Sequence, residues 1–222
     1  MQTYETEEQQ IDAIKQWIKK NGLSLLLAVT VPVAGLVAWK NWTGAQDAQH
    51  EAASVLYQEM IDASALLKNA EGKDTEKQLS TIQHLANQLI EEYPGLQYAH
   101  FAALTQAKLA VEKGDLATAV LKLQWVLAQK ADKPLLNVTT VRLARVLAAQ
   151  GEPDKALATL QELNDPAFQA LVEEVRGDIY LQKGDKDAAR SAYQRSIDVV
   201  SNNKQADRLV QLKLDDLALV KE

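Results

Sequence analysis

The sequence predicts an all-α fold in which a single N-terminal transmembrane helix precedes an α-solenoid of helical hairpins. An uncharged stretch over residues 21–39 is long enough to cross a bilayer. The rest of the 222-residue chain is rich in alanine, leucine and glutamine, with few glycines and prolines, a composition typical of helices. Three tight turns centred on glycine then recur at nearly equal intervals, which indicates repeated helical hairpins.

The predicted membrane helix has the sequence NGLSLLLAVTVPVAGLVAW and is bounded by Lys20 and Lys40. A helix of this length spans about 28 Å, close to the hydrocarbon thickness of a bilayer. A buried core helix and a cleaved signal peptide are the alternatives. The apolar core of a signal peptide is shorter than this stretch, and residues 43–45 give only a weak cleavage pattern. Pro32 lies at mid-span, where a membrane helix tolerates it if neighbouring groups satisfy the freed carbonyl.

The charges that flank this stretch predict its orientation. Lys15, Lys19 and Lys20 precede it, whereas Lys40 stands alone on the other side until Lys68. Basic residues stay preferentially in the cytoplasm. We therefore expect residues 1–20 to form a cytoplasmic tail, residues 21–39 to cross the membrane, and residues 40–222 to form a domain on the far side.

Small residues within the membrane helix would allow another helix to approach closely. Pro32 adds a kink that could mark contact with a second membrane protein. The residues expected to contact such a membrane partner are Ala28, Pro32, Gly35 and Leu36.

The composition and the motifs argue against catalysis and against nucleic-acid binding. The net charge of −6 gives no electrostatic footprint for nucleic acid, and the absence of cysteine excludes thiolate metal sites and disulfides. His50, His84 and His100 are far apart in the sequence. Neighbouring acids on a helix point about 100° apart, so pairs such as Glu173 and Glu174 do not form a catalytic pair. We expect no enzyme, no metal and no cofactor.

The glycine turns define a repeat. Gly114, Gly151 and Gly184 are 37 and then 33 residues apart. A small residue precedes each glycine by seven positions, an alanine follows by five, and a bulky residue comes four positions later. These three sets are Ala107, Ala144 and Gly177; Ala119, Ala156 and Ala189; and Leu123, Leu160 and Tyr193. Two helices joined by a tight turn approach closely where their facing side chains are small, and each hairpin must then stack on its neighbours.

This spacing resembles the tetratricopeptide repeat, whose period is about 34 residues. The segment 172–197 is the closest match, whereas residues 45–95 keep only traces of the pattern. The expected hairpins cover about 45–95, 97–130, 137–164 and 168–200, with a capping helix over 204–220. Asp115 and Asp185 are candidate N-caps, and Pro153 is a candidate first helical residue.

The resemblance to this repeat also implies a concave groove for an extended or helical peptide. The family's groove positions correspond to Phe101, Lys108, Glu112, Val138, Val141, Arg145, Leu171, Glu174, Asp178 and Gln182 in this sequence.

The whole layout resembles the YfgM family of ancillary SecYEG translocon subunits. The likeness rests on AIKQWIKKNG (13–22), VAWKNW (37–42), VRLARVLAAQGEPDKAL (141–157) and LVEEVRGDIYLQKGDKDAARSAYQRSI (171–197). It implies a single-pass protein of the bacterial inner membrane with a periplasmic repeat domain. The implied partners are the SecYEG channel, a PpiD-type membrane-anchored periplasmic chaperone and exported client proteins, which the protein would help to hand from the channel to chaperones.

Two alternative functions stay open at this point. An unrecognised hydrolase would need acids that cluster in the folded chain, and the other alternative is a scaffold. Related repeat domains also serve as envelope scaffolds or adaptors in cell division and cell-wall assembly. Such a scaffold would show the same anchor and the same repeats, so the sequence features described above do not separate the two functions.

Overall fold

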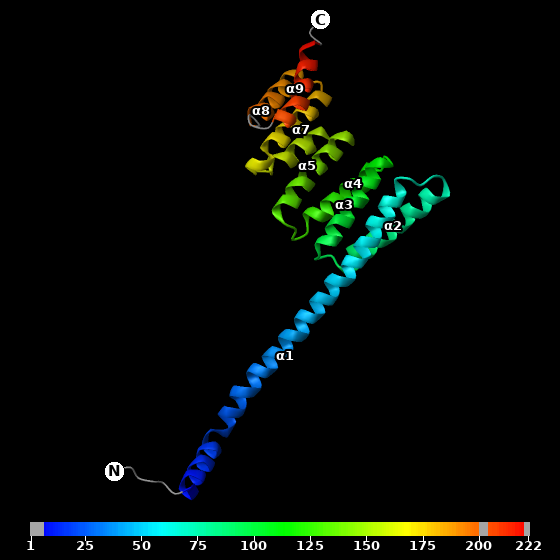
Figure 1. Cartoon of the computed structure of the whole chain (residues 1–222). Helices are drawn as coiled ribbons and strands as arrows, with labels where there is room; N and C mark the ends of the chain where they lie inside the picture. Colours follow the sequence, from blue (N-terminus) through cyan, green and yellow to red (C-terminus); the bar gives the residue numbers. More distant parts are fainter. Residues whose placement is uncertain (1–6, 200–203, 220–222) are drawn as a thin grey trace. The chain divides into compact units, whose positions relative to one another are not determined.

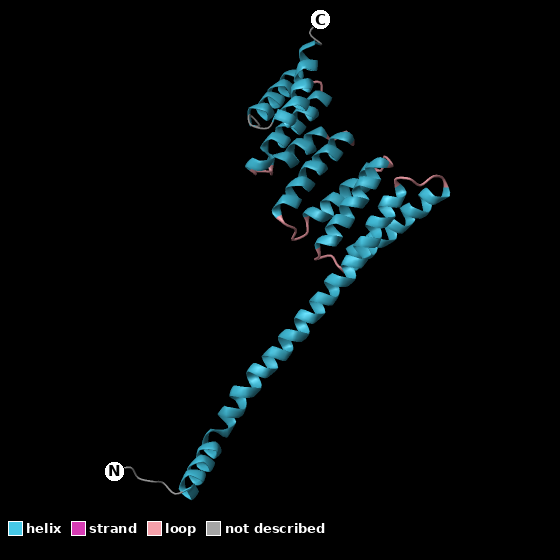
Figure 2. Cartoon of the chain, in the orientation of Figure 1, coloured by secondary structure: helices cyan, strands magenta, loops and turns pink. Residues whose placement is uncertain are grey.

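The computed structural model describes residues 7–199 and 204–219, and every element in these two ranges is helical (Figures 1 and 2). The α-helices are α1 (Glu7–Leu67), α2 (Lys73–Glu92), α3 (Gln97–Glu112), α4 (Leu116–Leu127), α5 (Lys133–Ala149), α6 (Pro153–Gln161), α7 (Gln169–Gln182), α8 (Lys186–Val199) and α9 (Lys204–Leu219), with a 3₁₀ turn η1 (Pro166–Phe168) before α7. The predicted all-α class is therefore confirmed.

The chain divides into two compact units, residues 1–52 and residues 53–222. In the first unit, α1 carries the apolar stretch with none of its apolar window buried against protein. Leu23 and Leu36 expose 75% and 68% of their surface. Because exposed leucines at this density are unfavourable in water, this part of α1 fits a single-pass membrane anchor. Pro32 lies inside the helix without ending it.

The second unit is a stack of antiparallel hairpins. Helices α3 and α4, α5 and α6, and α7 and α8 form the most intimate pairs, and each pair also contacts the next one along the chain. The last part of α1 pairs with α2 through a shared apolar cluster that contains Met60 and Leu89. Figure 1 shows the order of the hairpins along the chain. Since every hairpin contacts chiefly its neighbours in sequence, the unit is a solenoid.

The small residues of the repeat lie where the helices of each hairpin cross. Ala119, Ala156 and Ala189 have no exposed surface, and their partners on the preceding helix are buried as well. The bulky residues four positions later, among them Leu123 and Leu160, are also buried. The predicted spacing of small and bulky residues is therefore confirmed as the core of each hairpin, because only small facing side chains allow this close approach.

The three turns share one hydrogen-bonding pattern. Asp115 N–H donates to the carbonyl of Ala110 at 2.8 Å, and the equivalent bonds follow Gly151 and Gly184. Each of the three turn glycines has a φ between 77° and 85°. This is the Schellman C-cap, which needs a residue that adopts the left-handed conformation without strain. The repeated glycine is therefore a requirement of the turn itself.

The cap predictions are confirmed in the first and third repeats. Asp115 Oδ1 accepts from the Thr118 N–H, and Asp185 Oδ1 accepts from the Ala188 N–H, both at 3.0 Å. The second repeat has no side-chain cap, and Pro153 begins α6 instead.

Helix α5 begins at Lys133, four residues before the expected start of its hairpin at 137. Pro134 lies in its first turn. A proline is tolerated there because the first N–H groups of a helix have no intrahelical partner.

The expected capping helix corresponds to α9, and its predicted last residue, Val220, lies outside the described residues.

In the third repeat, the small residue of the first helix is smaller, and the bulky residue of the second helix is larger, than in the other two repeats. Where the first two repeats pair an alanine with a leucine, the third pairs Gly177 with Tyr193. Tyr193 has no exposed surface, and its hydroxyl donates to Asp178 Oδ1 at 2.8 Å. A Cβ atom built on Gly177 would overlap the ring of Tyr193. The ring therefore occupies the space that an alanine fills in the other repeats.

Gly177→Ala should destabilise the repeat domain by about 1–3 kcal/mol, because the new methyl group overpacks a filled core. The double variant Gly177→Ala/Tyr193→Leu recreates the pair found in the other repeats and should recover part of that loss. Urea unfolding of the full chain measures both. Gly95→Ala, where an added Cβ meets no atom within 4 Å, serves as the control. Equal stability of Gly177→Ala and the parent chain would contradict this packing.

His100 on α3 is buried, and the backbone of Pro94 and the carboxylate of Asp132 oppose only in part the effect of that burial on its pKa. Its ring centroid lies 6.1 Å from that of Trp125. Burial lowers the pKa of His100 below its ordinary value of 6.5. The folded chain therefore holds this imidazole neutral at pH values where the unfolded chain already protonates it.

This difference predicts a pH dependence of stability. As the pH falls below about 6.5, the unfolded state binds a proton that the folded state does not, so the free energy of unfolding should decrease. His100→Phe should flatten that part of the profile, whereas His84→Phe, at an exposed position, should leave it unchanged. Urea unfolding between pH 5 and 8 gives the comparison, and parallel profiles for His100→Phe and the parent chain would refute this role of His100.

Candidate functional site

The candidate site is a groove on the first helices of successive hairpins. Two adjoining cavities of about 440 Å³ and about 480 Å³ lie along residues 53–67 of α1, α3 and α5, and Thr105 lines both. We call the residues that line them the inner groove. The first cavity is lined by Tyr57, Gln97, Phe101, Leu104, Thr105, Asp132, Pro134, Leu135, Val138 and Arg142. The second is lined by Ile61, Ser64, Ala65, Leu67, Lys68, Ile82, Thr105, Lys108, Leu109 and Glu112.

Tyr57 and Phe101 belong to an aromatic cluster and line the first cavity. The ring of Tyr57 lies 5.3 Å from that of Tyr98 and 5.9 Å from that of Phe101, measured between centroids. These distances fall in the range in which tilted aromatic pairs attract one another. Burial, followed by the proximity of Tyr98, raises the pKa of Tyr57, so its phenol stays neutral. The cluster therefore offers an apolar surface with a hydroxyl that can donate or accept.

The charged groups of the inner groove are mixed in sign. Asp132 and Arg142 line the first cavity, and Lys68 lines the second. Lys108 and Glu112, one helical turn apart on α3, form an exposed ion pair at 3.7 Å. Exposed pairs of this kind contribute little to stability and leave both side chains mobile. The groove therefore suits an amphipathic peptide better than a strongly charged ligand.

The structure brings four of the sequence-predicted groove residues to the inner groove. Phe101 and Val138 line the first cavity, from α3 and α5 respectively. Lys108 and Glu112 line the second.

Three other predicted residues lie elsewhere. Val141 is 2% exposed and packs in the main apolar core, so it is not a groove residue. Arg145 is exposed but lines neither cavity, and Arg142, one turn earlier on α5, takes the place expected for it. Leu171 is half-buried against the core. Since each residue turns about 100° around a helix, a shift of one position separates groove from core.

The predicted groove residues on α7 are engaged by other parts of the chain. Lys213 of α9 donates to Glu174 Oε1 at 2.8 Å and to Asp178 Oδ1 at 2.7 Å. Gln182 donates from Nε2 to the carbonyl of Ala148 at 2.9 Å. Lys213 therefore neutralises both acids, and the inner groove as described ends at α5.

The sequence analysis missed the contribution of α1. Tyr57, Ile61 and Leu67 line the groove, although the segment around them carries only traces of the repeat pattern. With Ser64, which also lines the groove, these residues are spaced by four, three and three positions along α1, and that helical periodicity was the available signal.

No group of three or more metal-ligating side chains gathers within the part of the chain that the structure describes.

The residues predicted to contact a membrane partner are all exposed on α1; they are Ala28, Pro32, Gly35 and Leu36. Their spacing places them on one face of that helix.

Comparison with known proteins places the whole chain in one family. A family model described as a tetratricopeptide repeat-like domain matches residues 15–219. The protein named ancillary SecYEG translocon subunit in Escherichia coli K12 is 31% identical, and the match covers 99% of this chain and 100% of that protein. The protein of the same name in Haemophilus influenzae is also 31% identical, and the match covers 95% of this chain and 97% of that protein. The protein of that name in Neisseria gonorrhoeae is 27% identical and covers 95% and 97%. That name and that domain describe a non-catalytic kind of protein. The chain therefore belongs to the family of ancillary SecYEG translocon subunits.

Proposed function

We propose that this chain is a single-pass subunit associated with the SecYEG translocon in the bacterial inner membrane, and that it helps to hand newly exported proteins to periplasmic chaperones. The observation that carries the proposal is the similarity to ancillary SecYEG translocon subunits over almost the full length, anchor included. The apolar part of α1 supplies the anchor, and the solenoid supplies a binding surface.

The proposed orientation places the N-terminus in the cytoplasm and the repeat domain in the periplasm. Lys15, Lys19 and Lys20 precede the apolar stretch, and only Lys40 follows it closely. Such an imbalance favours retention of the N-terminal side in the cytoplasm. In this orientation the inner groove faces the compartment into which the channel releases exported chains.

The inner groove is the proposed binding surface for clients or for a PpiD-type membrane-anchored chaperone. Its aromatic side chains and the half-buried Leu135 and Val138 offer apolar contact to an unfolded segment. Thr105, Asp132 and Arg142 can bond to the polar groups of such a segment. A shallow groove of mixed character favours weak and reversible binding, as a hand-off between channel and chaperone requires.

The exposed face of α1 that contains Leu36 is the proposed contact with the channel. A photocrosslinking amino acid at Leu36 should yield adducts with a SecYEG subunit in intact membranes. Leu27 is the matched control, because it is also an exposed leucine and lies about half a turn around the helix. Strong adducts from Leu36 and weak ones from Leu27 are expected. If well-expressed protein gave no channel adduct from either position, the proposed association with SecYEG would be refuted.

The groove assignment predicts a separate loss of client contact. Val138→Asp places a charge in the apolar part of the first cavity and should reduce crosslinks to exported clients or to the chaperone several-fold. Leu121→Asp introduces the same charge at an exposed leucine on α4, outside the groove, and should have no effect. Thermal unfolding of both variants checks that they fold. Unchanged crosslinks in a folded Val138→Asp variant would remove the inner groove from the mechanism.

A further inference from the structure

Helix α9 has apolar side chains on two opposite sides. On one side, Val210, Leu214 and Leu217 pack against the hairpin α7–α8. On the other side, Leu209 and Leu212 expose 65% and 56% of their surface. The terminal helix of a solenoid normally presents a polar outer side to water. The two exposed leucines of α9 therefore depart from what a terminal cap requires.

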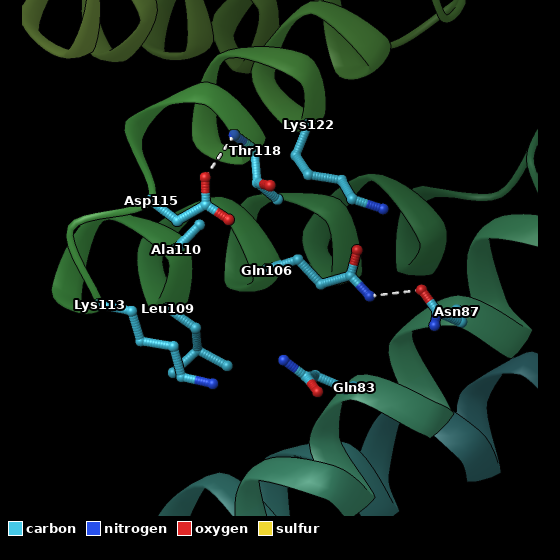
Figure 3. Close-up of a pocket in the computed structure, with 9 residues that line it drawn as sticks. All are labelled: Gln83, Asn87, Gln106, Leu109, Ala110, Lys113, Asp115, Thr118 and Lys122. Carbon is cyan, nitrogen blue, oxygen red and sulfur yellow. Dashed lines mark hydrogen bonds between the residues drawn. The ribbon is translucent and has the colours of Figure 1, made fainter. Parts of the chain in front are cut away.

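The cavity between α2, α3 and α4 shows the opposite situation (Figure 3). Its volume is about 220 Å³ and its lining is mainly polar. Gln106 Nε2 donates to Asn87 Oδ1 at 2.8 Å, and Asp115 Oδ1 accepts from the Thr118 N–H at 3.0 Å. Water solvates polar side chains of this kind, so the cavity alone gives no indication of a partner. Exposed leucines gain no comparable interaction with water, and two of them one turn apart favour a surface that covers them.

Charged residues flank the two leucines in a definite order along α9. Arg208 precedes them, Asp215 and Asp216 follow them, and all three charged residues are exposed. At about 100° per residue, every one of these side chains lies within about 60° of Leu212 around the helix. We call these five residues the outer face of α9. The face is basic toward the N-terminus of the helix and acidic toward its C-terminus.

This order of charges makes the outer face of α9 complementary to itself. Arg208 and Asp216 each lie four positions from Leu212, on opposite sides of it along the chain. When two copies of α9 pack antiparallel with Leu212 at the centre, Arg208 of each copy therefore lies level with the acids of the other copy. Parallel packing would instead bring like charges together, which is unfavourable. The charges thus favour a second, antiparallel copy as the partner of this face.

The same charges disfavour a lipid surface as the partner. The outer face of α9 has two acids and one base, so its net charge is negative. Anionic headgroups repel such a face, although they attract the basic amphipathic helices that lie on membranes.

We propose that the chain forms a two-fold symmetric homodimer through the outer face of α9. Leu209 and Leu212 of both copies form its apolar centre, and Arg208 of each copy pairs with Asp215 and Asp216 of the other. Because both copies use the same surface, the assembly closes at two. The membrane anchor confines the copies to one bilayer, which raises their effective concentration and allows a small interface to suffice. This dimer does not depend on the association with SecYEG.

Cysteine crosslinking tests whether two copies meet at this face. The sequence contains no cysteine, so a single introduced one reports contact between copies. Leu212→Cys lies at the proposed two-fold axis and should give a disulfide-linked dimer when the full chain is mildly oxidised in membranes. Gln211→Cys is exposed about 100° around the helix and should give at least several-fold less. Equal yields at the two positions, or no dimer from well-expressed Leu212→Cys, would overturn the proposal.

Charge variants of Leu212→Cys test whether the partner is a second copy. Arg208→Asp leaves only acids on the face, and Asp215→Arg/Asp216→Arg leaves only bases. Each should reduce the linked dimer at least several-fold, and co-expression of the two, with different tags, should restore it as a mixed dimer. Lys108→Asp, at an exposed position on α3, should have no effect. Full dimer yield in either variant alone, or no mixed dimer from two folded variants, would contradict the self-complementary face.

Energy transfer between labelled copies tests the apolar centre without a covalent bond. Donor-labelled and acceptor-labelled full chains are mixed in lipid vesicles, and transfer above the level of random proximity measures association. Leu209→Asp/Leu212→Asp should weaken association at least tenfold, whereas Leu121→Asp, at an exposed leucine of α4, should leave it unchanged. Thermal unfolding checks that both variants fold. Random transfer in the parent chain, or unchanged transfer in a folded Leu209→Asp/Leu212→Asp variant, would refute the dimer.

Discussion

The solenoid depends on the close crossing of two helices within each hairpin. Each hairpin buries an alanine on its second helix, an alanine or a glycine on its first helix, and a bulky residue four positions after the alanine of the second helix. Close crossing leaves the other apolar faces of the hairpin uncovered, so each hairpin is stable only against its neighbours. The main apolar core accordingly runs without interruption from α3 to α7. The inner groove is the surface that remains where the first helices of neighbouring hairpins meet.

The helices and their turns were predictable because they follow from local chemistry. Glycine at a left-handed turn, aspartate at an N-cap and alanine at a crossing each act within one hairpin, and Gly114, Asp115 and Ala119 lie where the sequence predicts. The candidate site was predictable only in part. Phe101 and Val138 line the groove, but Val141 lies in the core because a shift of one residue rotates a helix position by about 100°.

Other features of the site depend on contacts between distant parts of the sequence. Tyr57 reaches the groove from α1, whose sequence carries little of the repeat. Lys213 reaches the acids of α7 from 35 and 39 positions away, and no periodicity records that contact. Local rules therefore predict the helices and turns, whereas the residues that line the inner groove depend on packing between distant parts of the chain.

The contact of Lys213 with α7 also bears on assembly. A solenoid that ends on an open hairpin face can be extended by another copy that stacks end to end on it. Here α9 covers Tyr193 and neighbouring apolar residues, and Lys213 bonds to two carboxylates at the same end. A second copy that replaced α9 on this face would have to break those charged bonds first. The apolar face of the hairpin α7–α8 is therefore covered by α9 of the same chain, whereas Leu209 and Leu212 of α9 stay exposed.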